Sequence, residues 1–130
     1  MPRPFTVLLV EDDDPLRSSL VDVLSSQGWE VYAVAAGGEA LNLARRVRLD
    51  FSILDLHLPG MSGLEVLRRI AMEVRPLPAI MMSGQATAEE THAALRQGVF
   101  EFLRKPLDLA QLRFSMDQLI RQHFRSSDRP

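Results

Sequence analysis

Asp55 is a carboxylate that directly follows a largely apolar run, F-S-I-L (residues 51–54), which has the composition of a buried strand. Removing an unpaired carboxylate from water costs several kcal/mol or forces the group to take up a proton. A chain therefore rarely places such a group at a strand end without a partner from elsewhere in the sequence. Asp55 is the first candidate for a functional side chain.

Other reactive side chains also follow short apolar runs: the acidic run E-D-D (residues 11–13), Ser83 and Lys105. Carboxylates at close quarters repel one another, so a cation is needed to keep all of them ionised. Oxygen ligands without a histidine or thiolate cluster favour Mg²⁺. Lys105 supplies a point positive charge, and Ser83 supplies a hydroxyl that can donate to a phosphoryl oxygen. These residue types predict a phosphoryl-transfer site with Asp55 as the attacking nucleophile.

The elements that must position these residues alternate along the chain. The apolar segments that predict strands are residues 5–10, 29–35, 51–54, 77–82 and 100–104, and a longer amphipathic segment follows each of them. This alternation is typical of βαβ units, which build a parallel sheet with helices on both faces. We therefore expect a doubly wound α/β domain that carries its site at the carboxyl ends of the strands.

Capping residues set the expected limits of the helices. Asp14 is expected to be the N-cap of the first helix, which Gly28 ends. Thr87 and Glu90 have the spacing of a capping box at the start of the fourth helix. Asp108 is expected to cap the last helix. Of the acids after the first strand, residues 13 and 14 are interpreted as capping residues only.

Composition restricts the function further. The chain has 130 residues, of which 46% are hydrophobic and 25% charged, as in one ordinary globular domain. A net charge of -2 gives no electrostatic footprint for nucleic acid or for an acidic membrane surface. The absence of cysteine excludes disulfides and thiolate chemistry. No apolar run approaches the roughly 18 residues of a membrane span, and no secretory signal is evident, so we expect a cytoplasmic protein.

Four motifs carry a resemblance to the receiver domains of two-component response regulators. They are L-L-V-E-D-D (residues 8–13), L-D-L-H-L-P-G-M-S-G-L-E (54–65), M-M-S-G (81–84) and F-L-R-K-P-L (102–107). Each motif alone is weak, but four in this order, each at a strand end, are specific. The resemblance spans residues 5–123 and implies the (βα)5 flavodoxin-like fold with strand order 2-1-3-4-5. The receiver domain would occupy residues 1–124, and residues 125–130 would be a flexible tail or the start of a linker.

The resemblance implies how Mg²⁺ and the phosphoryl group would be held. A phosphohistidine on a sensor histidine kinase, or on a histidine phosphotransfer protein, would donate its phosphoryl group to Asp55. Asp12 would bind Mg²⁺ directly and Glu11 through water, while Asp55 and the backbone carbonyl of His57 would supply further metal oxygens. Lys105 would pair with the phosphoryl group. The domain would thus catalyse its own phosphorylation and dephosphorylation without being an enzyme in the usual sense.

The resemblance also implies a switch. The Ser83 hydroxyl would be drawn towards the phosphoryl group, and Phe102, three residues before Lys105, would change rotamer with it. The surface of helix four, strand five and helix five would then repack, and a homodimer through that surface is an additional expectation. We expect His57, facing solvent, and Gln85 to flank the water path and to modulate the lifetime of the phosphoryl group. The bond between Lys105 and Pro106 is expected to be cis.

Other functions fit the sequence less well. A metal-dependent aspartyl-phosphate phosphatase would need a second acid two residues after the nucleophile, where this chain has His57. A flavin carrier would need a phosphate-binding loop where this chain has four acids, residues 11–14, which would repel a phosphate. An interaction-only receiver would not need the complete set of acids, hydroxyl and lysine. No output domain follows the last helix, so we expect a stand-alone receiver, with a fragment of a longer regulator as the alternative.

Overall fold

Strands and helices alternate along the whole of the computed structural model, which describes residues 3–124 of the chain. The strands are β1 (Thr6–Val10), β2 (Glu30–Val34), β3 (Phe51–Asp55), β4 (Ala79–Ser83) and β5 (Glu101–Arg104). The helices are α1 (Asp14–Ser25), α2 (Gly37–Arg46), α3 (Gly63–Glu73), α4 (Ala88–Arg96) and α5 (Leu109–His123). The sequence therefore predicted the type and order of these elements correctly. The expectation for residues 125–130 lies outside the described residues.

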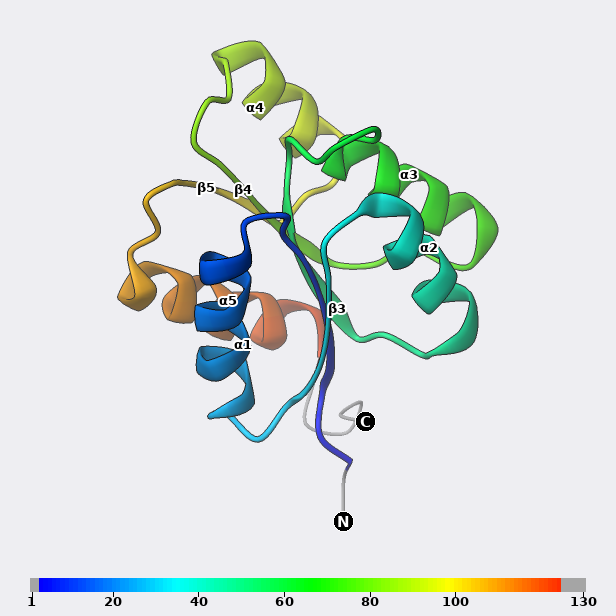
Figure 1. The fold of residues 1–130 in the computed structure, drawn as a ribbon, viewed down its shortest axis with the longest axis vertical. Coiled ribbons are helices and arrows are strands. Elements are labelled where there is room, and N and C mark those ends of the chain that lie inside the picture. Colours follow the sequence, from blue (N-terminus) through cyan, green and yellow to red (C-terminus); the bar gives the residue numbers. More distant parts are fainter. Residues whose placement is uncertain (1–2, 125–130) are drawn as a thin grey trace.

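All strand pairs are parallel, and the strands lie in the order β2-β1-β3-β4-β5 (Figure 1). The predicted strand order is confirmed. The chain leaves β1 towards β2 on one side and then crosses to β3 on the other side. The topological switch point therefore lies between β1 and β3, where doubly wound sheets bind their ligands.

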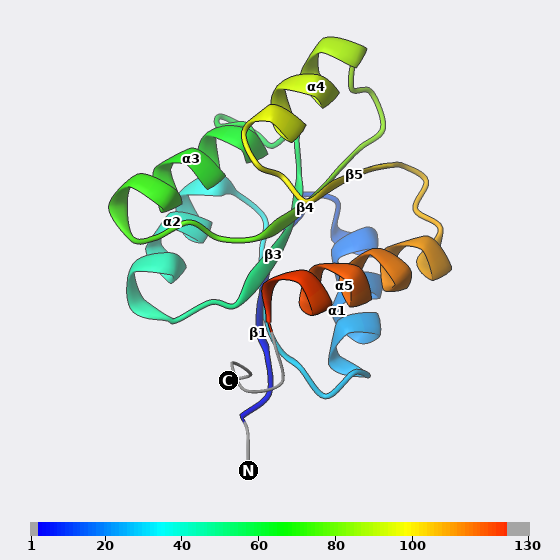
Figure 2. The same ribbon diagram turned by 180° about the vertical axis from the view of Figure 1, so that it is seen from behind.

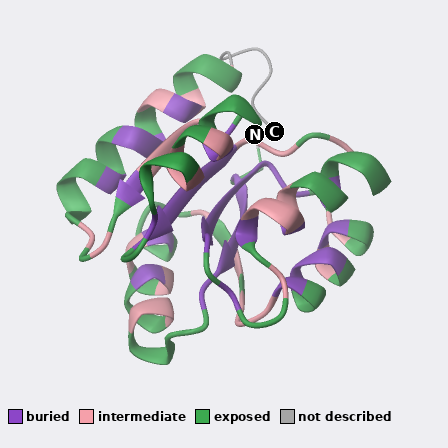
Figure 3. Ribbon diagram, turned by 90° about the horizontal axis from the view of Figure 1, so that it is seen from above, coloured by how far each residue is buried: buried purple, intermediate pink, exposed green. Residues whose placement is uncertain are grey.

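The helices cover the two faces of the sheet in separate layers (Figures 1 and 2). Alternate residues of each strand point to opposite faces, so β1 places Val7 and Leu9 against α1 and α5, and Leu8 and Val10 against α2 and α3. Strands β1, β3 and β4 are buried along their whole length, whereas the edge strand β2 is partly exposed. Figure 3 shows this buried sheet between helices whose outer faces are exposed. The sheet is thus a rigid base for residues at its carboxyl edge.

Local capping fixes where the helices begin. Thr87 and Glu90 form the expected capping box at α4, and Asp108 accepts hydrogen bonds at the start of α5. The expected N-cap of α1 was wrong, because Asp13 and not Asp14 caps this helix. Asp13 has extended backbone dihedrals, and its carboxylate accepts from the Leu16 amide at 2.9 Å. Asp14 already belongs to the first turn, where a negative charge is favoured by the helix dipole.

Two strands reach one residue further than expected. The amide of Leu56 donates to the Met82 carbonyl at 2.9 Å, and the amide of Lys105 donates to the Ser83 carbonyl at 2.9 Å. These bonds extend the ladder beyond the apolar segments, so Asp55 and Ser83 are the last residues of β3 and β4. Their backbones are therefore held by the sheet instead of by loops. The peptide bond between Lys105 and Pro106 is cis, as expected.

Candidate functional site

Carboxylates from two neighbouring strands meet at the switch point. Glu11 and Asp12 follow β1, and Asp55 ends β3. One carboxylate oxygen from each of the three residues lies within 4.8 Å of the others. Glu11 and Asp55 are buried, with 0% and 5% of their surface exposed, whereas Asp12 is exposed. The structure thus brings together the three acids that the sequence placed at separate strand ends.

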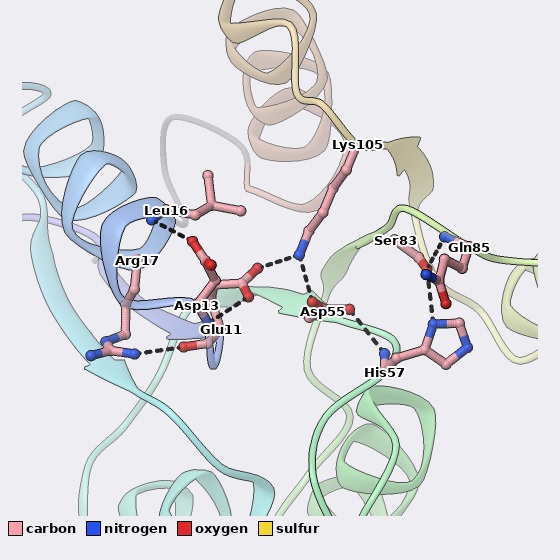
Figure 4. Close-up of polar contacts among 9 residues, drawn as sticks. All are labelled: Glu11, Asp13, Leu16, Arg17, Asp55, His57, Ser83, Gln85 and Lys105. Carbon is pink, nitrogen blue, oxygen red and sulfur yellow. Dashed lines mark hydrogen bonds and ion pairs between the residues drawn. The ribbon is translucent and has the colours of Figure 1, made fainter.

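Lys105 extends from the end of β5 into this acidic cluster (Figure 4). Its ammonium lies 2.7 Å from Glu11 Oε1 and 2.6 Å from Asp55 Oδ2. Burial by itself would lower the pKa of Lys105, but the hydrogen bonds and charges of Asp55 and Glu11 outweigh it, so the pKa is raised. Lys105 therefore remains protonated at neutral pH and partly balances the two buried carboxylates.

Glu11 is fixed by hydrogen bonds of its side chain and of its backbone. The carboxyl group accepts from the Asp13 amide at 3.0 Å, and the backbone carbonyl of Glu11 accepts from the Arg17 guanidinium at 2.9 Å. Burial raises the pKa of Glu11 even though Lys105 and the Asp13 amide oppose the shift, and the charge of Asp55 raises it further. The ionised form of Glu11 is thus disfavoured mainly because the carboxyl group is removed from water. A cation bound in the pocket would favour the ionised form.

Asp55 is aligned from two directions. Oδ2 accepts from Lys105, and Oδ1 accepts from the backbone amide of His57 at 2.9 Å. Gly63, the first residue of α3, lies directly against the backbone of Asp55, and a Cβ added there would be 2.2 Å from the Asp55 carbonyl oxygen. Only glycine allows this approach. The carboxylate therefore has a defined orientation towards the acidic cluster.

Ser83 lies on the other side of Asp55 from the acidic run (Figure 4). Its side chain is fully buried, and its hydroxyl contacts the His57 ring at 3.0 Å and accepts from the Gln85 amide at 3.2 Å. His57 is exposed, as expected, but its ring is also fixed by Glu90 at 3.0 Å. The sequence did not predict these two ring contacts. The only signal for them was the capping box, which fixes the Glu90 carboxylate at the first turn of α4.

Phe102 lies on β5, opposite Met81 of β4. Its ring is partly buried and packs against the hydrophobic core under α2, α3 and α4. This position, between the core and the surface of α4, is compatible with the expected rotamer change, which stays a prediction.

The acidic pocket fits a divalent cation by its donor set. All three side chains offer hard carboxylate oxygens, as Mg²⁺ prefers. Three carboxyl groups surround a single ammonium, that of Lys105, so a divalent cation would complement the charge of the pocket. The exposed position of Asp12 leaves the cluster open to solvent on one side, and Mg²⁺ usually keeps several of its waters.

Fold and site define a doubly wound α/β domain with an acidic, lysine-containing pocket at the carboxyl ends of its strands. Residues 7–117 match the family model described as "Response regulator receiver domain". The chain belongs to this family, whose members act in two-component signal transduction. Receiver domains interact with histidine kinases and bind Mg²⁺ at an acidic pocket.

Curated relatives agree with this family. The probable transcriptional regulatory protein TcrX of Mycobacterium tuberculosis is 32% identical over 120 residues, which are 92% of this chain and 51% of TcrX. The cell cycle response regulator CtrA of Brucella ovis is 33% identical over 116 residues, which are 89% of this chain and 50% of CtrA. The transcriptional regulatory protein GlrR of Escherichia coli is 32% identical over 126 residues, which are 97% of this chain and 28% of GlrR. The chain thus spans about half the length of these relatives, or less.

Solved structures share the fold. A putative response regulator from Chloroflexus aurantiacus has a TM-score of 0.82 and 30% identity, with 91% of this chain and 98% of that chain covered. The non-phosphorylated HemR receiver domain from Leptospira biflexa has a TM-score of 0.82 and 31% identity, with 89% and 94% covered. Within residues 3–124, no helix is long and apolar enough to cross a membrane.

Proposed function

We propose that this receiver domain accepts a phosphoryl group on Asp55 in a Mg²⁺-dependent reaction and thereby switches the surface formed by α4, β5 and α5. The observation that carries the proposal is the position of the Lys105 ammonium, which contacts Asp55 and Glu11 at 2.6 and 2.7 Å beside Asp12. The donor would be the phosphohistidine of a sensor histidine kinase or of a histidine phosphotransfer protein.

Asp12, Asp55 and the backbone carbonyl of His57 would hold Mg²⁺ directly, and Glu11 would hold it through water. When bound, the ion would offset the charge of the carboxylates and of the phosphoryl oxygens during transfer. The protein residues would do the remaining work. Lys105 would keep its proton, because its pKa is raised, and would pair with a phosphoryl oxygen.

In the transfer step, a carboxylate oxygen of Asp55 forms a bond to phosphorus while the bond between phosphorus and the donor's ring nitrogen breaks. The nitrogen keeps the electron pair, and the donor ring leaves as neutral imidazole with a proton on its other nitrogen. A carboxylate nucleophile has no proton to lose, so no general base is required. The His57 amide, which donates to Oδ1 at 2.9 Å, leaves the carboxylate in one orientation for this attack. Catalysis by the domain would then be mainly positioning and charge balance.

The phosphoryl group adds a charge of about -1.5 to -2 and strong acceptor oxygens. Ser83 would turn its hydroxyl towards these oxygens, and Phe102 would change rotamer as the space beside Ser83 changes. The α4–β5–α5 surface would then repack, and it would also be the surface for a homodimer. His57 and Gln85, both at the mouth of the site, would set the rate at which water removes the phosphoryl group.

We assign residues 1–124 to this domain, place it in the cytoplasm, and propose that it makes no direct contact with nucleic acid. Incubation with Mg²⁺ and a small acyl phosphate, followed by intact-mass measurement, tests the proposal. The wild-type chain should gain the mass of one phosphoryl group, and Asp55→Asn should not. Removal of Mg²⁺ with a chelator should abolish the gain. Equal labelling of both chains would refute the proposal.

A further inference from the structure

The imidazole ring of His57 connects the phosphoacceptor site with the first turn of α4. Its Nδ1 lies 3.0 Å from the Ser83 hydroxyl, and its Nε2 lies 3.0 Å from Glu90 Oε2. These three residues come from three segments, namely the loop after β3, the end of β4 and the helix α4. Figure 4 shows the ring turned towards Ser83, while the His57 amide faces Asp55. One residue thus contacts both the phosphoacceptor and the hydroxyl beside it.

The donor and acceptor groups of Glu90 and Ser83 set the direction of the two bonds to the His57 ring. A carboxylate only accepts, so the ring donates from Nε2 to Glu90. In the neutral ring, Nδ1 is then the acceptor, and the Ser83 hydroxyl donates its single proton to it. The Ser83 oxygen accepts from the Gln85 amide at 3.2 Å. In this tautomer of the neutral ring, the only proton of the Ser83 hydroxyl is committed to His57.

Glu90 is itself fixed by the helix start. Oε1 accepts from the Thr87 amide at 2.9 Å, and the Glu90 amide donates to the Thr87 hydroxyl at 3.1 Å. The Thr87 amide bond and the His57 contact lower the pKa of Glu90, which favours the carboxylate form. The oxygen that holds His57 thus belongs to a carboxylate whose other oxygen closes the capping box. The ring is connected to the backbone of α4 through one side chain.

We propose that His57 is a positioning residue that withholds the Ser83 hydroxyl from the phosphoryl group and couples its release to α4 through Glu90. This inference rests on the proposed function, since it requires a phosphoryl group on Asp55. To donate to a phosphoryl oxygen, Ser83 must give up its bond to Nδ1. Once that bond is broken, β4 is no longer connected through the ring to the first turn of α4. Phosphorylation and His57 therefore compete for one proton.

Binding of beryllofluoride, a noncovalent mimic of the phosphoryl group, measures this competition in the presence of Mg²⁺. In His57→Ala the backbone amide that faces Asp55 remains, and only the ring is removed. One hydrogen bond between neutral groups changes an equilibrium by about two- to tenfold, so His57→Ala should bind beryllofluoride more tightly by that factor. His92→Ala, which removes an exposed histidine of α4, is the matched control and should bind as the wild type does.

A double-mutant cycle shows whether the effect passes through the hydroxyl. In a Ser83→Ala background there is no proton to withhold, so adding His57→Ala should leave the affinity unchanged. The ring ¹⁵N resonances give a second readout, because beryllofluoride should change the Nδ1 signal in the wild type and not in Ser83→Ala. His57→Ala identifies the signal. Equal or weaker binding by His57→Ala, or the same gain in both backgrounds, would overturn the inference.

The two proposals fail in different ways. If the wild type binds beryllofluoride and is phosphorylated on Asp55, but His57→Ala has no effect, only the role of the ring is overturned. If the wild type neither binds beryllofluoride nor gains a phosphoryl group, the proposed function is wrong, and the inference about His57 is overturned with it.

Discussion

Replacing Lys105 by methionine tests the charge balance of the site. The ammonium donates to two buried carboxylates, at 2.7 Å to Glu11 and 2.6 Å to Asp55. A hydrogen bond to a charged group contributes about 1.5–3 kcal/mol. The Lys105 side chain is 20% exposed, and solvent screens part of this energy. We therefore expect Lys105→Met to lower the free energy of unfolding by about 3 kcal/mol in total, at neutral pH and without Mg²⁺.

The same variant should respond strongly to Mg²⁺. With the ammonium gone, the carboxyl groups lose their internal cation, and Mg²⁺ no longer has to compete with it. An ion at a hundred times its dissociation constant stabilises a fold by about 2.7 kcal/mol, so saturating Mg²⁺ should restore most of the lost stability. The gain should be larger in Lys105→Met than in the wild type, because the wild-type pocket is already partly neutralised.

Thermal unfolding with and without Mg²⁺ is the assay. For a domain of this size, 1 kcal/mol corresponds to about 4 °C in Tm, so the loss should be about 12 °C. Arg104→Met is the matched control, because it removes one positive charge from the neighbouring exposed residue of β5. The reasoning is refuted if Lys105→Met unfolds like Arg104→Met, or if Mg²⁺ stabilises the wild type and the variant equally.

Further substitutions address the pH dependence, the backbone of the phosphoacceptor and the capping box. Because burial raises the pKa of Glu11 above that of the unfolded chain, its stabilising contribution is complete below about pH 4.5 and is lost as pH rises through the raised value. In metal-free buffer, the free energy of unfolding of Glu11→Gln, relative to that of the wild type, should therefore rise from pH 4 to pH 7. A difference between the two that does not change with pH would contradict this. Gly63→Ala should slow labelling of Asp55 by acyl phosphate more than tenfold, because its Cβ would displace the Asp55 carbonyl; an unchanged rate would show that this contact is not needed. Thr87→Ala should lower the free energy of unfolding, measured in urea, by about 1 kcal/mol. Ser62→Ala, which removes the side-chain cap of α3, is the comparison. An unchanged free energy of unfolding in Thr87→Ala would contradict the role of the capping box.

Strand-end positions made most of the site predictable from the sequence. In a parallel sheet, every carboxyl end reaches the same edge, so residues that follow apolar runs must approach one another. Asp12, Asp55 and Lys105 could be assigned to one pocket in this way. Glu11 and Lys105, which are in contact there, are 94 positions apart in the sequence. The alternation of strands and helices was sufficient for this assignment, because the sheet itself sets the positions of these residues.

Side-chain contacts at the mouth of the site could not be predicted in the same way. The ring of His57 lies between Ser83 and Glu90 because of its rotamer and the position of α4, and neither follows from spacing in the sequence. The choice between Asp13 and Asp14 as the N-cap was also open locally, since adjacent acids can both accept from helix amides. The extended backbone at Asp13 decides it, and the sequence pattern does not encode that dihedral.

Trapping the phosphorylated residue tests the central claim most directly. Borohydride reduces an aspartyl phosphate to homoserine, and peptide mass spectrometry then identifies the position that carried the phosphoryl group. After incubation with Mg²⁺ and an acyl phosphate, homoserine should appear at position 55 and should be absent when Mg²⁺ is chelated. Homoserine at position 12 or 13, or labelling at position 55 that persists without Mg²⁺, would contradict the account.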